Sequence, residues 1–173
     1  VSRNLEPLRG LRQAVLAWPA IAAAVPDAQL LLVGDRGQGY GMEVPPAGED
    51  HLSAALRTLP QEVDHQRIHW LGTLDHPSMV RLLQVSACHL ALSYPYTLSW
   101  SVLEAMACGA ALVSNHGSPI ARELIDGHNG LLVPFNDHHA LAQAVIELLN
   151  HPARRAQIGT AALHTIAQRF SLP

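Results

Sequence analysis

Two arginines near the start of the chain are placed so that both could bind one anion. Arg3 and Arg9 lie six residues apart in the segment RNLEPLRG, which directly follows what reads as the end of a β-strand. Guanidinium groups form charge-assisted hydrogen bonds with phosphate oxygens, and two of them across a turn can converge on a diphosphate. The same spacing also fits two ordinary surface arginines, so the segment alone leaves both interpretations open.

A second candidate group lies in residues 93–109, SYPYTLSWSVLEAMACG. Apolar strand residues give way there to hydroxyl and aromatic residues, and then to a helical run with a single acid, Glu104. We expect Ser99 to be the N-cap of a helix that begins around Trp100 and Ser101, where free N–H groups and the helix dipole favour a phosphate. Glu104, about one turn further on, could accept hydrogen bonds from sugar hydroxyls. A capping serine and an outward-facing glutamate with no ligand are the structural alternative.

The glycine-rich segment from Gly34 to Gly41 does not fit the dinucleotide-binding fingerprint. That fingerprint, Gly-x-Gly-x-x-Gly, needs a third glycine at a fixed step and a helix directly after it. Met42 occupies the step of the third glycine, and Pro45-Pro46 excludes the helix. The segment therefore predicts either a mobile loop that passes close to a ligand or a plain surface loop.

The sequence gives little support for metal binding, nucleophilic catalysis or lysine-dependent chemistry. The eleven histidines form no convincing ligand set: His138 and His139 are adjacent and diverge on a helix, and His65 and His69 flank the start of a strand. There is no Gly-x-Ser-x-Gly motif and no Cys-His arrangement typical of a nucleophile. All eleven cationic side chains are Arg, so P-loop and Schiff-base chemistry, which need Lys, are excluded. We expect neither a metal nor a cofactor.

The elements that must position these residues alternate along the chain. Apolar runs predict strands at 29–34, 67–72, 88–93, 111–115 and 131–135, and helical spacing predicts helices at 10–25, 49–59, 76–87, around 119–125, 137–149 and up to about 168. Strands that are continuously apolar are typical of a parallel sheet covered by helices on both faces. Ligands bind beyond the carboxyl ends of the strands in such sheets.

Composition narrows the possible partners. The formal net charge of −3 comes without basic or acidic blocks, so we expect no nucleic-acid partner and no membrane contact. Cys88 and Cys108 lie in apolar settings, which favours a reducing, cytoplasmic compartment. The apolar tract at 14–25 contains Pro19 and is shorter than the ~20 residues that span a bilayer. The abrupt start, without an initiator Met, leads us to expect an upstream domain.

Taken together, the order of these motifs resembles the C-terminal, donor-binding domain of family 4 (group 1) retaining glycosyltransferases, which have the two-domain GT-B arrangement. The segments that carry the resemblance are RNLEPLRG, AQLLLVG, IHWLG, SVLEAMACG and NGLLV. It covers nearly the whole chain, so residues 1–173 would form one Rossmann-like domain that binds the nucleotide sugar. The N-terminal acceptor domain would lie outside this sequence.

The resemblance also implies site residues. Arg3 and Arg9 would be catalytic residues that grip the donor diphosphate, and Glu104 would bind ribose hydroxyls as the second acid of the family's E-x7-E pattern. Tyr96 stands where the first acid, which contacts the transferred sugar, is expected, and Thr97-Leu98-Ser99 replaces the usual glycine-aromatic-glycine. The implied donor-binding residues are Gly34, Tyr96, Ser99, Trp100, Ser101, Val102 and Glu104.

The implied reaction is transfer of a sugar, with retention, from a nucleoside diphosphate sugar to an unknown acceptor bound by the N-terminal domain. The isolated chain would then bind donor weakly and transfer nothing. Two alternatives remain: a non-catalytic nucleotide- or partner-binding module of the same descent, which Tyr96 favours, and a nucleotide-sugar epimerase. A phosphorylase would need a lysine for pyridoxal phosphate, and this sequence contains none.

Overall fold

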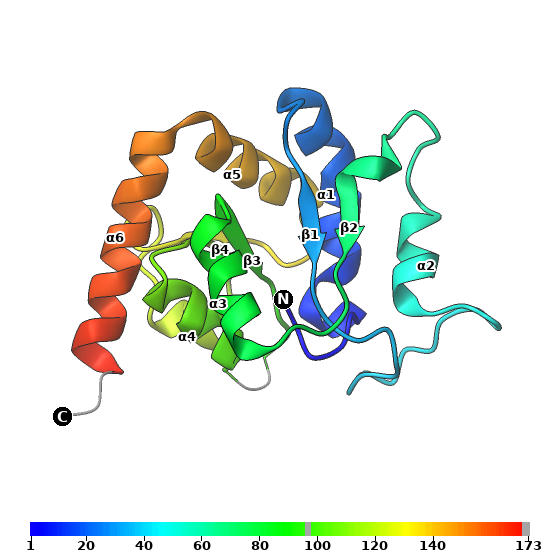
Figure 1. Ribbon diagram of the computed structural model, residues 1–173, viewed down its shortest axis with the longest axis horizontal. Coiled ribbons are helices and arrows are strands. Elements are labelled where there is room, and N and C mark those ends of the chain that lie inside the picture. The colour runs from blue at the N-terminus through cyan, green and yellow to red at the C-terminus, as the bar shows by residue number, and fades with distance from the viewer. Residues whose placement is uncertain (96–97, 171–173) are drawn as a thin grey trace.

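Short parallel strands alternate with helices in the computed structural model, which describes residues 1–95 and 98–170 (Figure 1). The strands are β1 (Leu30–Leu32), β2 (Ile68–Trp70), β3 (Cys88–Ala91), β4 (Ala111–Asn115) and β5 (Leu131–Val133). The α-helices are α1 (Leu11–Ala24), α2 (His51–Leu56), α3 (His76–Val85), α4 (Trp100–Ala107), α5 (His138–Asn150) and α6 (Pro152–Arg169). Short 3₁₀ helices occupy Pro7–Arg9, His65–Arg67 and Pro119–Arg122.

Local sequence explains where several helices begin. Asp50, Asp75 and Asp137 are the N-caps of α2, α3 and α5, and each carboxylate accepts a hydrogen bond from the backbone N–H three residues on. The predicted strands and the other predicted helices are present. Most have shorter bounds than predicted, whereas β4 matches its predicted bounds, α5 is displaced by one residue and α6 ends one residue later. The segment predicted as a short helix at 119–125 forms only a 3₁₀ helix, which begins with Pro119.

The strands form two parallel ladders in the described part of the chain. In one, β1 pairs with β2, with Leu30 opposite Ile68. In the other, β4 lies between β3 and β5, with Cys88 opposite Ala111 and Val113 opposite Leu131. The predicted α/β fold with parallel strands is confirmed, but no ladder joins β1 to β3 among the described residues.

Helices cover both faces of the β3-β4-β5 ladder. Every residue of β4 is buried. Ala111 and Val113 belong to a core shared with α1 and α5, whereas Leu112, between them, packs with Met106 of α4 and Ala162 of α6. This alternation places α1 and α5 on one face and α4 and α6 on the other, as expected for a continuously apolar strand.

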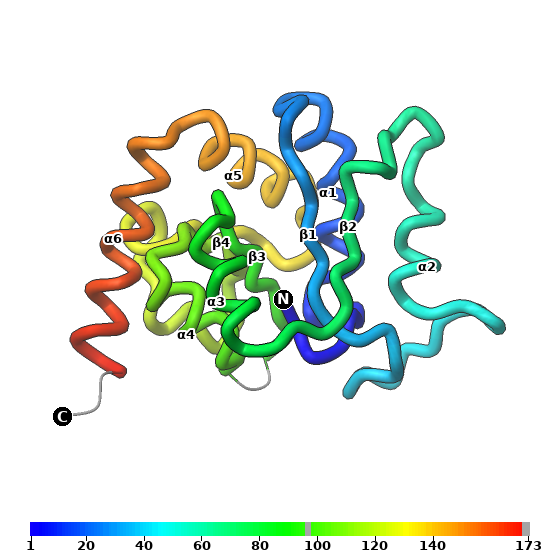
Figure 2. Tube along the Cα trace, in the orientation of Figure 1, coloured from blue at the N-terminus to red at the C-terminus, as the bar shows by residue number. Residues whose placement is uncertain are grey.

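The β1-β2 ladder packs against α1 and α2. Leu32 lies in a core with Val15 of α1 and with Leu52 of α2. Figure 1 shows this pair of strands beside the β3-β4-β5 ladder, with α2 and α6 at opposite ends of the molecule. Figure 2 shows that the segment after the N-terminus and the loop after β1 reach the same lower edge.

Candidate functional site

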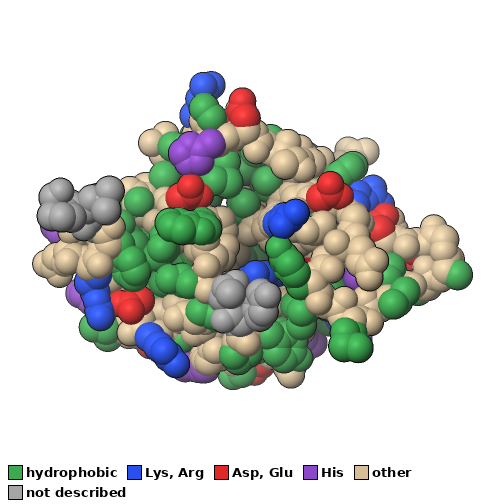
Figure 3. Space-filling view, turned by 90° about the horizontal axis from the view of Figure 1, so that it is seen from below, with side chains coloured by type: hydrophobic (Ala, Val, Ile, Leu, Met, Phe, Trp, Pro, Cys, Tyr) green, Lys and Arg blue, Asp and Glu red, His purple; other side chains and the backbone are tan. Residues whose placement is uncertain are grey.

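A hollow of about 1070 Å³ opens at the carboxyl edge of the strands and continues inward between the two ladders. Figure 3 looks onto this edge and shows the hollow near its centre, with acidic, basic and apolar side chains around its rim. All of the predicted site residues that the structure describes line this hollow: Arg3, Arg9, Gly34, Ser99, Trp100, Ser101, Val102 and Glu104. Tyr96, also predicted, lies outside the described residues.

The two arginines are held by neutral groups. Arg9 Nη1 donates to Ser93 Oγ at 3.2 Å, and Arg3 Nη1 donates to Tyr40 Oη at 2.9 Å. Among the described residues neither guanidinium forms an ion pair with a carboxylate. Both positive charges at the hollow are therefore available to an anion.

Gly10 fixes the segment that carries Arg9. It has a positive φ of 73° and is the N-cap of α1. A Cβ atom at Gly10 would lie 2.3 Å from the Cβ of Leu92, so only glycine fits. Tyr94 N donates to Leu8 O at 3.1 Å, which ties the same segment to the chain after β3. The arginine loop and the chain leading to α4 are thereby joined.

Glu6 supports the glycine-rich loop, a role that the sequence reasoning missed. Its side chain is buried at 2% exposure, and its Oε2 accepts from Gly41 N at 3.0 Å. A Cβ at Gly39 would lie 2.1 Å from the same oxygen, so the loop passes directly over the carboxylate. The one available signal was an acid between two arginines in RNLEPLRG.

The far part of that loop is anchored by Arg36. Its guanidinium donates to Asp50 and Ser53 and lies 4.9 Å from the centre of the Trp70 ring. Burial alone would raise the pKa of Asp50, but the hydrogen bonds from Arg36 and Ser53 outweigh it and lower this pKa to about 2.

The segment from 34 to 50 contains no helix. This agrees with the prediction that the glycine-rich segment is not a dinucleotide-binding motif.

Gly34 is explained by close packing. A Cβ atom there would lie 2.4 Å from the backbone oxygen of Ser2. Its carbonyl oxygen accepts from the indole N–H of Trp70 at 2.9 Å. The backbone of Gly34 therefore lets the first residues of the chain approach β1, and its contact with a donor stays a prediction.

The start of α4 leaves backbone donors uncapped by side chains. Ser99 occupies the N-cap position as predicted, but its Oγ is hydrogen-bonded to Ser101 Oγ at 2.8 Å rather than to a backbone N–H. Trp100, the next residue, is 80% exposed. Because the first N–H groups of a helix have no partner within it, this terminus can bind an anion.

Glu104 contacts a histidine that the sequence reasoning also missed. His76 Nε2 lies 2.9 Å from Glu104 Oε1, which links the first residue of α3 to α4. The Glu104 side chain is 29% exposed and borders the hollow. No pattern in the sequence pairs these two residues, because 28 positions separate them.

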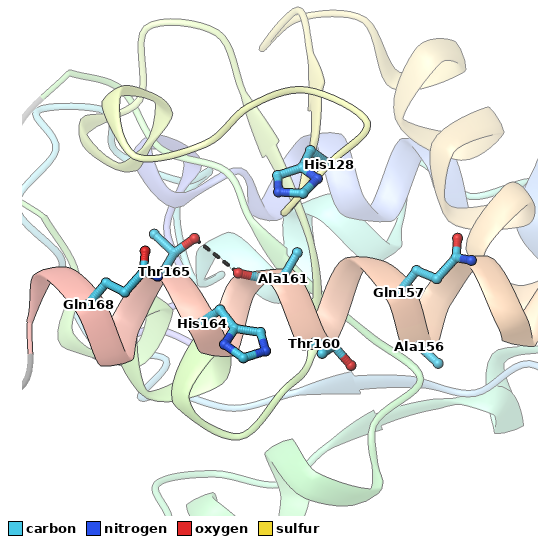
Figure 4. Close-up of a pocket in the computed structure, with 8 residues that line it drawn as sticks. All are labelled: His128, Ala156, Gln157, Thr160, Ala161, His164, Thr165 and Gln168. Carbon is cyan, nitrogen blue, oxygen red and sulfur yellow. Dashed lines mark hydrogen bonds between the residues drawn. The ribbon is translucent and has the colours of Figure 1, made fainter.

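A second, smaller hollow of about 570 Å³ lies along α6 (Figure 4). His128 faces it from the turn before β5, and the remaining lining residues belong to α6: Ala156, Gln157, Thr160, Ala161, His164, Thr165 and Gln168. None of these lining residues is an arginine or an acid. This hollow therefore lacks the charges that the first one gathers.

Two negative findings concern the described residues alone. Within 1–95 and 98–170, no three or more His, Cys, Asp or Glu side chains gather closely enough to hold a metal ion. In the same ranges, no helix combines the length and apolar character that crossing a bilayer requires.

Guanidinium groups, helix amides and a carboxylate around one hollow, at the carboxyl edge of parallel strands, define a Rossmann-like domain suited to a phosphate-bearing ligand. The family model described as "Glycosyl transferases group 1" matches residues 1–151, and the chain belongs to this family.

A relative of similar sequence supports this membership, and two solved structures share the fold. The chain is 31% identical over 169 residues to a GDP-mannose-dependent monoacylated alpha-(1-6)-phosphatidylinositol monomannoside mannosyltransferase of Corynebacterium glutamicum, and covers 91% of itself but only 39% of that protein. The C-terminal domain of the group 1 glycosyl transferase LpcC from Francisella tularensis superimposes with a TM-score of 0.83 at 16% identity, over 98% of this chain and 84% of that one. HepE from Anabaena, in complex with UDP and glucose, gives a TM-score of 0.73 at 22% identity, over 97% and 42%.

Proposed function

We propose that this chain is the donor-binding domain of a retaining glycosyltransferase that uses a nucleoside diphosphate sugar. The observation that carries the proposal is that Arg3, Arg9 and Glu104 line one hollow together with the start of α4. Family membership supports transferase chemistry, and a structural neighbour crystallised with UDP and glucose supports this class of donor.

In this proposal the arginines act on the leaving group. Departure of a diphosphate builds negative charge on its oxygens. Preorganised cations and helix amides directed at that charge stabilise the transition state, and this is usually the largest contribution to catalysis. Arg3 and Arg9 face the hollow without carboxylate partners among the described residues, and the amides near Ser101 add to their field. Because these groups supply positive charge, we propose that the reaction needs no metal.

Glu104 is proposed to hold the ribose. A carboxylate has about four lone-pair sites, so Oε1 can keep its contact with His76 while the other oxygen accepts from ribose hydroxyls. A diphosphate at the arginines and the start of α4 would leave the nucleoside beside this carboxylate. The same hollow would then bind both the diphosphate and the ribose of the nucleotide.

The rest of the reaction is proposed to depend on chain outside this sequence. The 173 residues span about two fifths of the Corynebacterium relative. We place the acceptor site in that additional part, and we expect residues 1–173 alone to bind donor without transferring the sugar. The free thiols of Cys88 and Cys108 support a cytoplasmic location for this domain.

A non-catalytic nucleotide-binding module is the second candidate, favoured by Tyr96 in place of the expected first acid. Hydrolysis of UDP- or GDP-sugars by the full-length protein, with water as the acceptor, separates the two. We expect release of nucleoside diphosphate and, by NMR, a product with the anomeric configuration of the donor. Arg9→Ala should abolish turnover, and Arg12→Ala, an exposed α1 arginine outside the hollow, should not. Intact donor in all samples would favour the module, and inversion would refute the retaining mechanism.

A further inference from the structure

The guanidinium of Arg9 is held by a hydroxyl group whose own proton is already used. Arg9 Nη1 donates to Ser93 Oγ at 3.2 Å, and Ser93 Oγ donates to the backbone oxygen of Tyr94 at 2.8 Å. A hydroxyl has one donor and two lone pairs, so the Ser93 oxygen meets Arg9 as an acceptor once its proton is directed at Tyr94. This contact orients the guanidinium without neutralising its charge.

Ser93 is in turn fixed by Asn115, the last residue of β4. Asn115 Oδ1 accepts from Ser93 N at 2.8 Å, and Asn115 Nδ2 donates to Ser93 O and to His116 O, each at 3.0 Å. Only one orientation of the amide satisfies one N–H and two carbonyl oxygens, because Oδ1 accepts and Nδ2 donates. Asn115 therefore holds both backbone polar groups of Ser93.

Both members of this pair are buried. Asn115 is 2% exposed and Ser93 is 8% exposed. A buried polar network whose groups are all hydrogen-bonded is rigid, because breaking any one bond leaves a buried group without a partner. Of Asn115 and its two bonded partners in the described part of the chain, only Ser93 lines the large hollow. An effect of Asn115 on a bound ligand would therefore pass through Ser93.

The support of Arg3 is of a different kind. Arg3 is exposed, and its Nη1 donates to the hydroxyl of Tyr40, a residue of the glycine-rich loop that is itself 56% exposed. A side chain that is held before the ligand arrives loses less conformational entropy on binding. Of the two arginines, Arg9 is thus the one that a buried network holds in a fixed direction.

We propose that Ser93 and Asn115 are positioning residues that direct Arg9 at the leaving diphosphate, an inference that rests on the function proposed above. Charge stabilises a transition state most effectively when its carrier is already oriented by supporting hydrogen bonds. Ser93 acts through Arg9, and Asn115 acts through Ser93. Loss of either residue should reduce the contribution of Arg9 to binding of the diphosphate.

Calorimetry on the full-length protein with UDP and uridine tests Ser93, with GDP and guanosine instead if GDP binds more tightly. Ser93→Ala should weaken UDP by about three- to tenfold and leave uridine unchanged, because only UDP carries the diphosphate. Ser93→Thr keeps the hydroxyl group and should recover most of the loss. In the Arg9→Ala background, Ser93→Ala should have no further effect on UDP.

Asn115 has a matched control in its neighbour Ser114. Ser114 is fully buried, and its Oγ donates to Ala91 O at 2.9 Å, so Ser114→Ala also removes a buried hydrogen bond between β4 and the end of β3. We expect both Asn115→Ala and Ser114→Ala to lower the urea midpoint. Only Asn115→Ala should weaken UDP, by about three- to tenfold. If Asn115→Ala does not fold, the Ser93 variants decide the question.

The possible results separate this inference from the proposed function. Unchanged UDP affinity in Arg9→Ala would refute the diphosphate site itself. If Arg9→Ala weakens UDP, the positioning role is wrong in either of two cases: Ser93→Ala leaves UDP unchanged or weakens uridine equally, or it keeps its full effect in the Arg9→Ala background. Equal loss of UDP affinity in Asn115→Ala and Ser114→Ala would show that Asn115 acts only through stability.

Discussion

Nε2 of His76 lies 2.9 Å from Oε1 of Glu104, so the carboxylate proposed to bind ribose is held between α3 and α4 rather than left free in solvent. Asp75 caps α3 by accepting from Ser78 N at 2.9 Å, which fixes the backbone from which His76 projects. A side chain that is held in place loses less conformational entropy when it binds a ligand. His76 therefore orients Glu104 in this account.

Replacing His76 tests that orienting role. We expect His76→Ala to weaken binding of nucleoside diphosphate by a few-fold, because one hydrogen bond contributes about 0.5–1.5 kcal/mol. His76→Gln, which keeps a donor at a similar reach, should recover much of the loss. Isothermal titration calorimetry measures both variants. Tighter binding by His76→Ala would mean that the imidazole competes with the ligand for Glu104.

Gly10 and Gly48 form a matched pair for testing the junction between the arginine loop and Leu92. Both have positive φ, 73° and 82°, but a Cβ would clash with Leu92 only at Gly10, whereas Gly48 has open space. We expect Gly48→Ala to cost about 1–2 kcal/mol from backbone strain. Gly10→Ala adds a core clash of about 1–3 kcal/mol. Urea unfolding measures both, and equal losses would contradict the described contact.

The Asp50 carboxylate predicts a separate loss of stability in acid. Hydrogen bonds from Arg36 and Ser53 outweigh the effect of burial and lower its pKa to about 2, so its contribution is present above about pH 4 and is lost as pH falls through about 2. Asp50→Asn should unfold more readily at pH 6 and lose less stability between pH 4 and pH 2. Thermal unfolding at several pH values measures this, and identical acid profiles would contradict it.

Regular elements and the edge that carries the site could be predicted from the sequence because both depend on local patterns. Continuous apolar runs identified β3 and β4, and the sequence order placed Arg9 and Glu104 beyond strand ends. Ser99 was located correctly as an N-cap, but its bond to Ser101 rather than to a backbone N–H depends on a side-chain rotation that propensity does not specify.

Contacts between distant segments could not be predicted. His76 reaches Glu104, and Glu6 reaches Gly41, only because separate loops meet at one edge. The absence of a ladder between β1 and β3 in the described residues was also missed, since an apolar run gives no information about which of its two edges is paired. Charge and spacing identified candidate ligand groups, whereas packing decided which neighbours hold them.

The central claim is that one hollow binds the diphosphate through Arg9 and the ribose through Glu104. Calorimetry on full-length protein with UDP, uridine and 2′,3′-dideoxy-UDP, or with the guanine series if GDP binds more tightly, tests it most directly. Since a hydrogen bond to a charged group contributes about 1.5–3 kcal/mol, Arg9→Ala should weaken UDP about 10- to 100-fold and leave uridine unchanged. Glu104→Ala should weaken UDP and uridine alike and leave the dideoxy compound unchanged, with Arg12→Ala as the neutral control. Unchanged UDP affinity in both Arg9→Ala and Glu104→Ala would contradict the account.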